Sequence, residues 1–276
     1  MAVARDPLPF DLVAFDLDGT VLRRDLEITD RTVSVVGRLR EAGVRVLVAT
    51  GRHFEGAREH AARLGLDEHE PIICYGGSMV RRMDASETLL LRAVPTGSAL
   101  DALRWAAERG LHARVFLDGR IVTGPETPAV VRYMRRRDEP NVEVVEDLSS
   151  WLVQSGERPL KLVFVDGPEE VERWLGEARD ALSGELFVTR SLPHYVELGN
   201  PEGTKAAALG YLCRRFGIEP SRVAAFGDAD NDVDMLRFAG LGVAVGGMTG
   251  EVRAAADVVV PPVGEDGVAR FLEELI

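Results

Sequence analysis

Short apolar runs alternate with helically spaced apolar positions along the first part of the chain. Phe10–Asp16 is an apolar run that ends in carboxylates, which predicts a strand. Asp30–Ala42 has apolar residues at helical spacing, with Thr29 as its N-cap and Gly43 just past its end, which predicts a helix. The alternation continues with a strand at Val44–Ala49, a helix at Glu55–Leu64 that Gly65 ends, and a strand at Pro71–Cys74. This order of elements predicts a parallel, doubly wound sheet.

The pattern changes from about residue 78. Met79–Arg82 and Thr88–Arg92 have the form of antiparallel ribbons, and Asp118-Gly119 is a two-residue hairpin signal between two apolar runs. Further elements are predicted as helices at Thr96–Arg109, Thr127–Arg137, Leu148–Gln154 and Glu169–Leu182, and as strands at Ala113–Leu117, Arg120–Thr123, Val142–Val145, Lys161–Val165, Leu186–Arg190 and Tyr195–Leu198. This segment predicts a mixed layer of helices and strands.

The rhythm of the first segment returns toward the carboxyl end. It predicts helices at Thr204–Phe216, Val233–Phe238 and Gly267–Leu275, and strands at Val223–Phe226, Gly242–Val245 and Val258–Val260. The simplest arrangement belongs to the α/β fold class, with a doubly wound, mostly parallel, Rossmann-like core built from both ends of the chain. We expect the core to comprise residues 1–82 and 191–276, and an inserted α+β domain to comprise residues 83–190.

Composition narrows the class of protein. Hydrophobic residues make up 46% of the chain and charged residues 28%, as in globular proteins. No apolar run approaches the roughly 18 residues of a membrane span, and residues 1–10 lack the apolar stretch of a secretory signal. Cys74 and Cys213 are far apart, which favours a reducing, cytoplasmic location. The net charge of −12 disfavours nucleic acid and anionic membranes, and a small anionic substrate would need a metal or a basic pocket.

Two acidic clusters follow predicted strands. Asp16 and Asp18 share one face of an extended segment, and Gly19 allows the chain to turn after them. The second cluster, residues 227–232, has the sequence GDADND and follows the run Val223–Phe226. One such cluster is also typical of an ordinary strand-to-turn boundary. Two clusters at the same edge of a parallel sheet would repel each other without a cation, and with no His or Cys cluster nearby they favour Mg²⁺ over zinc.

Two further motifs carry phosphate-binding groups. Thr50, Gly51 and Arg52 end a predicted strand with a hydroxyl, an open amide and a guanidinium, although a strand end alone also explains Thr-Gly. Of the 33 basic residues only Lys161 and Lys205 are lysines, so a lysine is a rare choice in this chain. A point charge beside the acidic cluster explains Lys205, whereas the helix dipole weakly disfavours a lysine in a first helical turn.

The motifs occur in the order Asp-x-Asp-Gly-Thr, Thr-Gly-Arg, Lys and Gly-Asp-x-x-Asn-Asp, each at a strand end or a helix start. In this order they resemble the haloacid dehalogenase superfamily. An insert of roughly a hundred residues between the second and third motifs, and an ending like Ala256-Asp257-Val258, resemble its Cof-type phosphatases. The resemblance covers nearly the whole chain. It implies that the insert is a cap domain that selects the substrate.

The resemblance implies a Mg²⁺-dependent phosphatase of small phosphomonoesters, with sugar phosphates as the leading class. Asp16 would be the nucleophile that forms an aspartyl-phosphate, a known strategy for carboxylates. Asp18 would protonate the leaving alkoxide and then deprotonate the hydrolytic water. Mg²⁺ would be held by Asp16, Asp228 and the backbone carbonyl of Asp18.

Other positions that match the family motifs are expected to hold the phosphoryl group or to support the site. They are Thr50, Gly51, Arg52, Lys205 and Asn231 at the phosphoryl oxygens, Asp232 beside Lys205 or a metal water, and Gly76 and Gly77 near the substrate. The chain departs from the family at Gly76 and Gly247, where Asn is usual, and at Ala206 and Ala229, where Gly is usual. Substrate placement can therefore differ from that of a typical member.

The cap offers weaker candidates for substrate selection. They are Arg190, His194 and Tyr195. His53 follows Arg52, but five scattered histidines without metal-ligand spacing are more often surface or core residues.

Two alternative functions remain at this stage. One is a phosphomutase, because phosphomannomutases of the same superfamily have a similar cap and aspartyl-phosphate. The other is a phospho-acceptor signalling protein resembling a receiver domain, which shares the acceptor Asp, the hydroxyl and the Lys but needs no cap. The oligomeric state is unknown.

Overall fold

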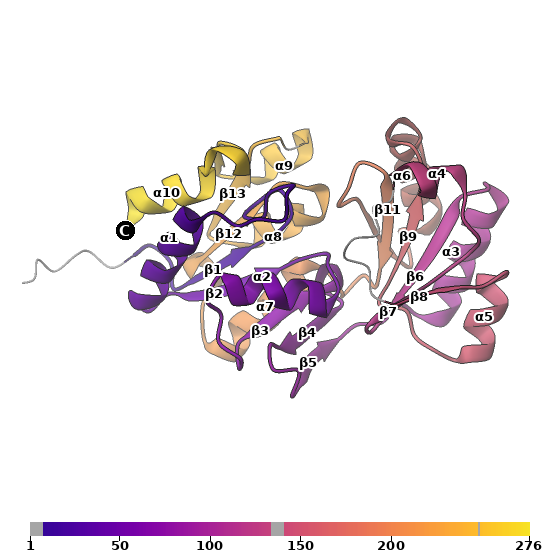
Figure 1. Ribbon diagram of the computed structural model, residues 1–276, viewed down its shortest axis with the longest axis horizontal. Coiled ribbons are helices and arrows are strands. Elements are labelled where there is room, and N and C mark those ends of the chain that lie inside the picture. The colour runs from indigo at the N-terminus through magenta and orange to yellow at the C-terminus, as the bar shows by residue number, and fades with distance from the viewer. Residues whose placement is uncertain (1–7, 134–140, 248) are drawn as a thin grey trace, which may run out of the picture.

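The computed structural model describes residues 8–133, 141–247 and 249–276, and in these residues the strands form two sheets. Figure 1 shows the sheets as two lobes along the long axis of the molecule, with both ends of the described chain in the same lobe. The strand order of the first sheet is β14-β13-β12-β1-β2-β3-β4-β5. The order of the second sheet is β10-β11-β9-β6-β7-β8. The predicted α/β class with an inserted domain agrees with this arrangement.

Six strands of the first sheet run parallel. They are β1 (Leu12–Phe15), β2 (Arg45–Ala49), β3 (Pro71–Cys74), β12 (Val223–Gly227), β13 (Leu241–Val245) and β14 (Val258–Val260). The antiparallel strands β4 (Met79–Arg82) and β5 (Thr88–Leu91) extend one edge. Phe15 at the end of β1 pairs with Phe226 of β12 on one side and with Val48 of β2 on the other. The carboxyl ends of these three strands therefore lie side by side.

Helices cover both faces of the first sheet. α1 (Asp30–Glu41), α2 (Phe54–Arg63) and α10 (Gly267–Leu275) pack on one face, and α7 (Lys205–Phe216), α8 (Val233–Phe238) and α9 (Gly250–Ala255) pack on the other. The strand β1 has the pattern expected for a sheet buried on both faces, since all four residues are buried. Val13 and Phe15 belong to one apolar cluster, whereas Leu12 and Ala14 belong to the other.

The second sheet is covered differently. Its strands are β6 (His112–Leu117), β7 (Arg120–Thr123), β8 (Asn141–Val144), β9 (Lys161–Val165), β10 (Phe187–Thr189) and β11 (Tyr195–Gly199). One face packs against α3 (Thr96–Glu108), α5 (Leu148–Ser155) and α6 (Pro168–Leu182). On the other face the short helix α4 (Pro128–Tyr133) covers part of β9. In β6 the alternate residues Ala113 and Val115 face the helices, so Arg114 and Phe116 face the opposite side.

Strand pairing differs from the predicted boundaries at residues 82/83 and 190/191. The strand β5 pairs with β4 in the first sheet, although it was assigned to the insert. The strand β11 pairs with β9 over five residues in the second sheet, although it was assigned to the core. Each strand belongs to the sheet of its antiparallel partner. Apolar runs in the sequence do not reveal which strand that partner is.

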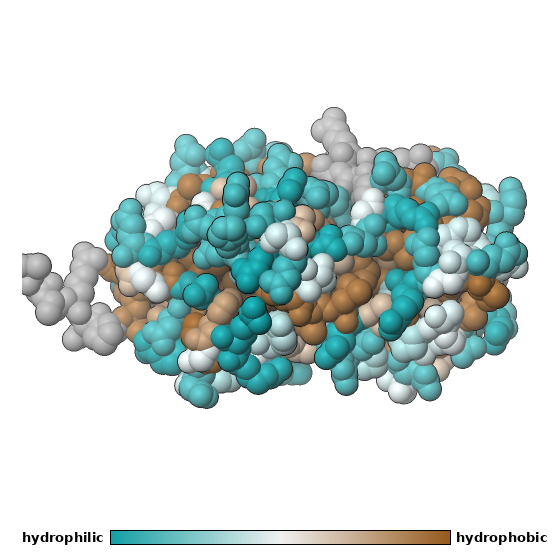
Figure 2. Space-filling model, turned by 90° about the horizontal axis from the view of Figure 1, so that it is seen from below, coloured by the Kyte–Doolittle hydropathy of each residue, from teal (hydrophilic) through white to brown (hydrophobic). Residues whose placement is uncertain are grey.

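Most helices lie within one or two residues of their predicted bounds, and α9 is an element that the sequence did not predict. Among its six residues only Val252 is buried, so no apolar period stands out in the sequence. The predicted helix Thr127–Arg137 is present as α4, and its residues 134–137 lie outside the described residues. No helix within the described ranges has the length and apolar character needed to cross a membrane. Hydrophilic residues dominate the face shown in Figure 2, with smaller hydrophobic areas among them.

A glycine in the turn between β3 and β4 determines how closely α7 approaches the first sheet. Gly77 has a φ of +110°, and a Cβ atom there would lie 2.1 Å from the backbone oxygen of Thr204. Thr204 caps α7, because its side chain accepts a hydrogen bond from the amide of Ala207. The helix that begins with Lys205 thus rests on the backbone of Gly77.

We predict that Gly77→Ala lowers the free energy of unfolding by about 2–5 kcal/mol, from the left-handed backbone together with the displacement of α7. The matched control is Gly43→Ala in the same lobe, where φ is +85° but no atom lies within 4 Å of an added Cβ. It should lose only about 1–2 kcal/mol. Urea unfolding of both variants measures the difference, and equal losses would show that the contact with Thr204 is not limiting.

Candidate active site

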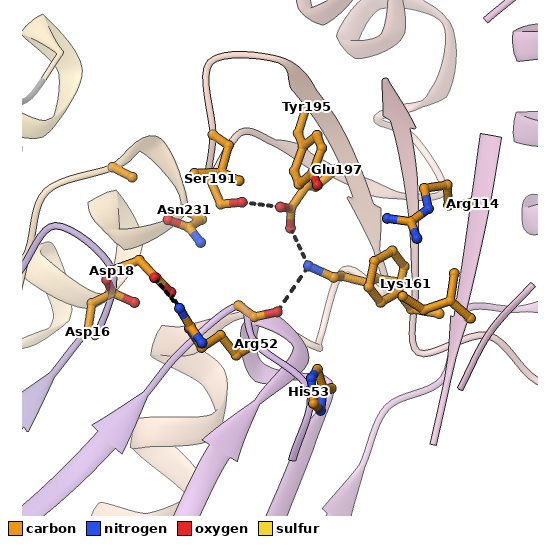
Figure 3. A pocket seen from close by; sticks show the side chains of 15 residues that line it. Asp16, Asp18, Arg52, His53, Arg114, Lys161, Ser191, Tyr195, Glu197 and Asn231 are labelled. Atoms are coloured by element: carbon orange, nitrogen blue, oxygen red, sulfur yellow. Dashed lines mark hydrogen bonds and ion pairs between the residues drawn. The ribbon is translucent and has the colours of Figure 1, made fainter. Parts of the chain in front are cut away.

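A cavity of about 210 Å³ lies between the two sheets at the carboxyl ends of β1, β2 and β12 (Figure 3). The predicted site residues that line it are Asp16, Asp18, Gly51, Arg52, Asn231 and Tyr195. Thr50, Lys205, Asp228 and Asp232 lie behind this wall, in contact with the lining residues or with each other. The two acidic clusters therefore meet at one edge of the sheet, as the order of strands predicted.

Gly19, in the loop after β1, lets the Asp228 carboxylate from the loop after β12 lie close against it. Gly19 has a φ of +87°, and a Cβ atom there would lie 2.2 Å from Oδ2 of Asp228. Thr20 Oγ1 donates a hydrogen bond to Oδ1 of Asp228 over 3.0 Å. The backbone amide of Asp16 donates to the carbonyl of Phe226 over 3.0 Å. These contacts hold the Asp16 and Asp228 carboxylates in neighbouring positions.

A buried ion-pair network lies at the centre of the site. The Nζ atom of Lys205 is 2.6 Å from Oδ1 of Asp16 and 2.6 Å from Oδ1 of Asp232, and its side chain has no exposed surface. The second oxygen of Asp232 accepts the backbone amides of Asp228 and Ala229, each over 3.1 Å. Both oxygens of Asp232 are thus occupied. The structure places Asp232 against Lys205, and its role in orienting Lys205 or a metal water stays a prediction.

Burial and charge perturb the titration of this network. Burial raises the pKa of Asp16 well above its usual value, Lys205 opposes this shift, and Asp232 and Asp228 add to it. Burial and the charge of Asp232 raise the pKa of Asp228 to about 7. Burial alone would lower the pKa of Lys205, but Asp16 and Asp232 raise it above its usual value. The protein supplies fewer positive charges than these carboxylates require, which favours an added cation.

The donor set fits a divalent cation. One oxygen each from Asp16, Asp228 and Asp232 lies within 4.8 Å of the others. Because Asp232 is engaged with Lys205 and two amides, Asp16 and Asp228 are the carboxylates best placed to act as ligands. Oxygen ligands of this kind suit a hard cation.

The turn after β2 is fixed to the core by its backbone. Thr50 is fully buried, its amide donates to Ile73, and its hydroxyl accepts the amide of Arg52 over 3.2 Å. The amide of Gly76 donates to the carbonyl of Thr50 over 2.9 Å. Gly76 and Gly77 therefore support the turn and α7, and neither lines the cavity described above. Their expected place beside the substrate remains a prediction.

Arg52 lies at the cavity wall and pairs with a carboxylate of the site. Its Nε and Nη2 atoms donate to the two oxygens of Asp18, each over 2.7 Å. The guanidinium holds the carboxylate of Asp18 at the cavity wall (Figure 3). That Arg52 binds phosphate stays a prediction. A bidentate pair of this kind fixes the orientation of both side chains.

The absence of a side chain at Gly51 leaves open space in the cavity. An added Cβ would lie 3.6 Å from Nδ2 of Asn231, 3.9 Å from Nζ of Lys161 and 4.0 Å from Cβ of Ser191, all ordinary contact distances. Asn231 is buried, and its backbone N–H donates to the backbone carbonyl of Arg190 over 3.2 Å. The space beside Gly51 is thus bordered by the core on one side and by residues 161 and 191 on the other.

The three weaker candidates occupy different places. Tyr195 lines the cavity. Arg190 pairs with Asp230 over 2.8 Å and with Glu172 over 2.7 Å, so it joins the second lobe to the loop after β12. The ring of His194 packs edge-on against Tyr195 with 4.5 Å between ring centres, and burial lowers the pKa of His194. The structure places neither Arg190 nor His194 on the cavity wall.

Sequence reasoning missed several lining residues. They are His53, Arg114, Phe116, Lys161, Ser191 and Glu197. Lys161 and Glu197 are 6% and 4% exposed, although each lies within an otherwise apolar predicted strand. A charged side chain inside a buried strand was the available signal. The rarity of lysine in the chain was a second signal for Lys161, as it was for Lys205.

Residues 13–272 match the haloacid dehalogenase-like hydrolase family. The chain belongs to this family. It is 31% identical to the phosphoglycolate phosphatase of Methanopyrus kandleri, over 96% of this chain and 97% of that protein. It is 27% identical to the pyridoxal phosphate phosphatase YbhA of Escherichia coli, over 95% and 97% of the two chains.

A solved structure has the same fold. The crystal structure of a haloacid dehalogenase-like hydrolase from Bacteroides thetaiotaomicron is 27% identical, covers 97% of this chain and 100% of its own, and has a TM-score of 0.78. Membership in the haloacid dehalogenase-like hydrolases confirms the predicted superfamily and Cof-type subgroup, and the phosphatase relatives support an enzyme of that class. They speak against a signalling module that only accepts phosphate.

We predict that Lys205→Met lowers the free energy of unfolding by about 3–5 kcal/mol, because it leaves the buried carboxylates of Asp16 and Asp232 without their cation. The control is the double variant Lys205→Met/Asp232→Asn, which removes one of the two carboxylate charges and should regain part of the loss. Denaturant unfolding without divalent metal gives both values. If the single and double variants unfold at the same denaturant concentration, charge pairing does not explain the effect of Lys205.

Proposed function

We propose that this haloacid dehalogenase-like hydrolase is a Mg²⁺-dependent phosphatase that hydrolyses small phosphomonoesters, sugar phosphates or similar metabolites, through an aspartyl-phosphate on Asp16. The observation that carries the proposal is the Asp16 carboxylate at the cavity wall, 2.6 Å from the buried Lys205 ammonium and beside Asp228. The named substrates of the two relatives, phosphoglycolate and pyridoxal phosphate, are small phosphorylated metabolites with unlike leaving groups.

Mg²⁺ would be held by the carboxylates of Asp16 and Asp228 and the backbone carbonyl of Asp18, and it would supply positive charge for the transferring phosphoryl oxygens. Lys205 holds one oxygen of Asp16, which fixes the direction of the carboxylate. An Asp16 oxygen attacks phosphorus and the P–O bond to the leaving group breaks. Asp18, in its protonated form, gives its proton to the leaving-group oxygen. The product is the aspartyl-phosphate on Asp16.

In the second step a water attacks the phosphorus of the aspartyl-phosphate. Asp18, now ionised, takes a proton from that water, the bond from phosphorus to Asp16 breaks, and inorganic phosphate leaves. Both Asp18 oxygens accept bonds from Arg52 in the structure, so Arg52 must release one of them before Asp18 donates to a leaving group. Thr50, the Gly51 amide and Asn231 are the proposed partners of the phosphoryl oxygens.

We predict that Asp16→Asn reduces phosphate release by roughly a thousand-fold or more, since an amide cannot form the covalent intermediate. Asp25→Asn, an exposed aspartate outside the cavity lining, is the control and should keep wild-type activity. The assay measures free phosphate from a panel of sugar, nucleotide and cofactor monophosphates, with Mg²⁺ or EDTA. Residual turnover of a few per cent in Asp16→Asn would remove Asp16 as the nucleophile.

The same assay separates hydrolysis from the phosphomutase alternative. A phosphatase releases inorganic phosphate in proportion to substrate consumed, whereas a mutase converts one phosphate ester to its isomer without net release. Product analysis by ³¹P NMR on the most active substrates makes this distinction.

Asp18→Asn is predicted to slow the hydrolysis of alkyl phosphates by about 10²–10⁴-fold, because their alkoxide leaving groups need a proton. The loss should be smaller for 4-nitrophenyl phosphate, whose leaving group is stable as an anion. Comparing kcat/KM for the two ester types tests the acid role. Equal losses for both would contradict it.

A further inference from the structure

A buried ammonium from the second sheet reaches the turn that follows β2. Lys161 opens β9, and its Nζ donates to the carbonyl oxygen of Gly51 over 3.0 Å and to Oε2 of Glu197 over 3.0 Å. The Lys161 and Glu197 side chains are 8% and 5% exposed. The ammonium also lies 4.9 Å from the centre of the Phe116 ring. Figure 3 shows this contact crossing the cavity from the second sheet to the first.

The acceptor of this bond belongs to the peptide that joins Gly51 to Arg52. The amide of the same peptide donates to Thr50 Oγ1 over 3.2 Å, so the core binds one side of the peptide and the second sheet binds the other. A glycine next to a peptide leaves it unusually free to rotate. The Lys161 bond removes that freedom. It also fixes the point from which the Arg52 side chain extends to Asp18.

The lysine is itself held in place. Glu197 accepts from Lys161 with one oxygen and from the hydroxyl of Ser191 with the other. A compact ammonium can donate to a single carbonyl and a carboxylate in different directions, whereas the planar fork of Arg suits a bidentate partner. This difference explains a lysine in a chain whose basic residues are otherwise almost all Arg.

We propose that Lys161 is a positioning residue: held by Glu197, it fixes the Gly51–Arg52 peptide and so sets the phosphate-binding turn for catalysis when the two lobes are in contact. This inference rests on the proposed function. It makes the second lobe part of the machinery that acts on every substrate, in addition to any contact it makes with the leaving group.

Two other roles for Lys161 predict different results. If Lys161 only neutralises buried Glu197, removing the charge of Glu197 as well should restore activity. If Lys161 only recognises the leaving group, its loss should depend on which ester is used. A positioning role predicts a loss that is shared by all esters and that neutralising Glu197 does not repair.

The experiment compares Lys161→Met, Lys161→Arg and the double variant Lys161→Met/Glu197→Gln with the wild type. The readouts are kcat and KM for 4-nitrophenyl phosphate and for the best alkyl phosphate, with thermal unfolding as the check on folding. We expect kcat to fall roughly ten- to a hundred-fold in all three variants, by similar factors for both esters, because misplacement of a catalytic group by about 1 Å has effects of this size. Recovery in the double variant, full activity in Lys161→Arg, or a loss confined to one ester would overturn the inference.

A binding measurement keeps the inference testable without turnover. Titration calorimetry with inorganic phosphate and Mg²⁺ should show roughly ten-fold weaker binding to Lys161→Met and to the double variant than to the wild type. If the wild type binds phosphate but hydrolyses no ester, the proposed function fails and this comparison alone decides the role of Lys161. Equal phosphate affinities in wild type and Lys161→Met would overturn the positioning role of Lys161. A wild type that neither binds phosphate nor hydrolyses an ester would overturn both proposals.

Discussion

The bridge that Lys205 makes between Asp16 and Asp232 is the constraint on which the site depends. Its three members come from the loop after β1, from the start of α7 and from the loop after β12, and Asp16 and Lys205 are 189 positions apart in the sequence. A buried charge is tolerated only where its partners are held close, so each segment must arrive within narrow limits. Gly77 lets α7 approach the sheet, and the absence of a Cβ at Gly227 lets Asp232 fold back, since that atom would lie 2.4 Å from Cβ of Asp232.

The core and the position of the candidate site were predictable because both depend on local patterns. Buried parallel strands appear as apolar runs, helices as a longer apolar period, and the polar groups that follow each strand must meet at one edge of the sheet. Asp16, Asp18 and Asp228 could be placed together on that basis. The motif order then gave each a role, although it did not show that Arg52 pairs with Asp18.

The second lobe was less predictable, because its contribution depends on which face of a sheet is covered. Lys161 and Glu197 lie in short strands whose other residues are mostly apolar, and only the helices packed behind the sheet determine that these two point into the cavity. Antiparallel pairing likewise sets to which of the two sheets β5 and β11 each belong, and the sequence of a short strand does not indicate its partner. These features depend on distant contacts rather than on local sequence.

Charged and polar groups make several of the contacts between the two lobes, beside the packing of Leu160 and Phe116 against the apolar core of the first sheet. Arg81 in β4 pairs with Asp118 in the hairpin between β6 and β7 over 2.5 Å, and Arg190 pairs with Asp230. Lys161 adds its bond to the Gly51 carbonyl. Polar contacts between domains are compatible with relative motion, since they can be exchanged for water at small cost. Two of the three contacts end on loops that also carry site residues, so contact between the lobes and alignment of the site would occur together. A lobe that separates to admit substrate would then leave the turn after β2 less well ordered, and water would meet an incomplete site.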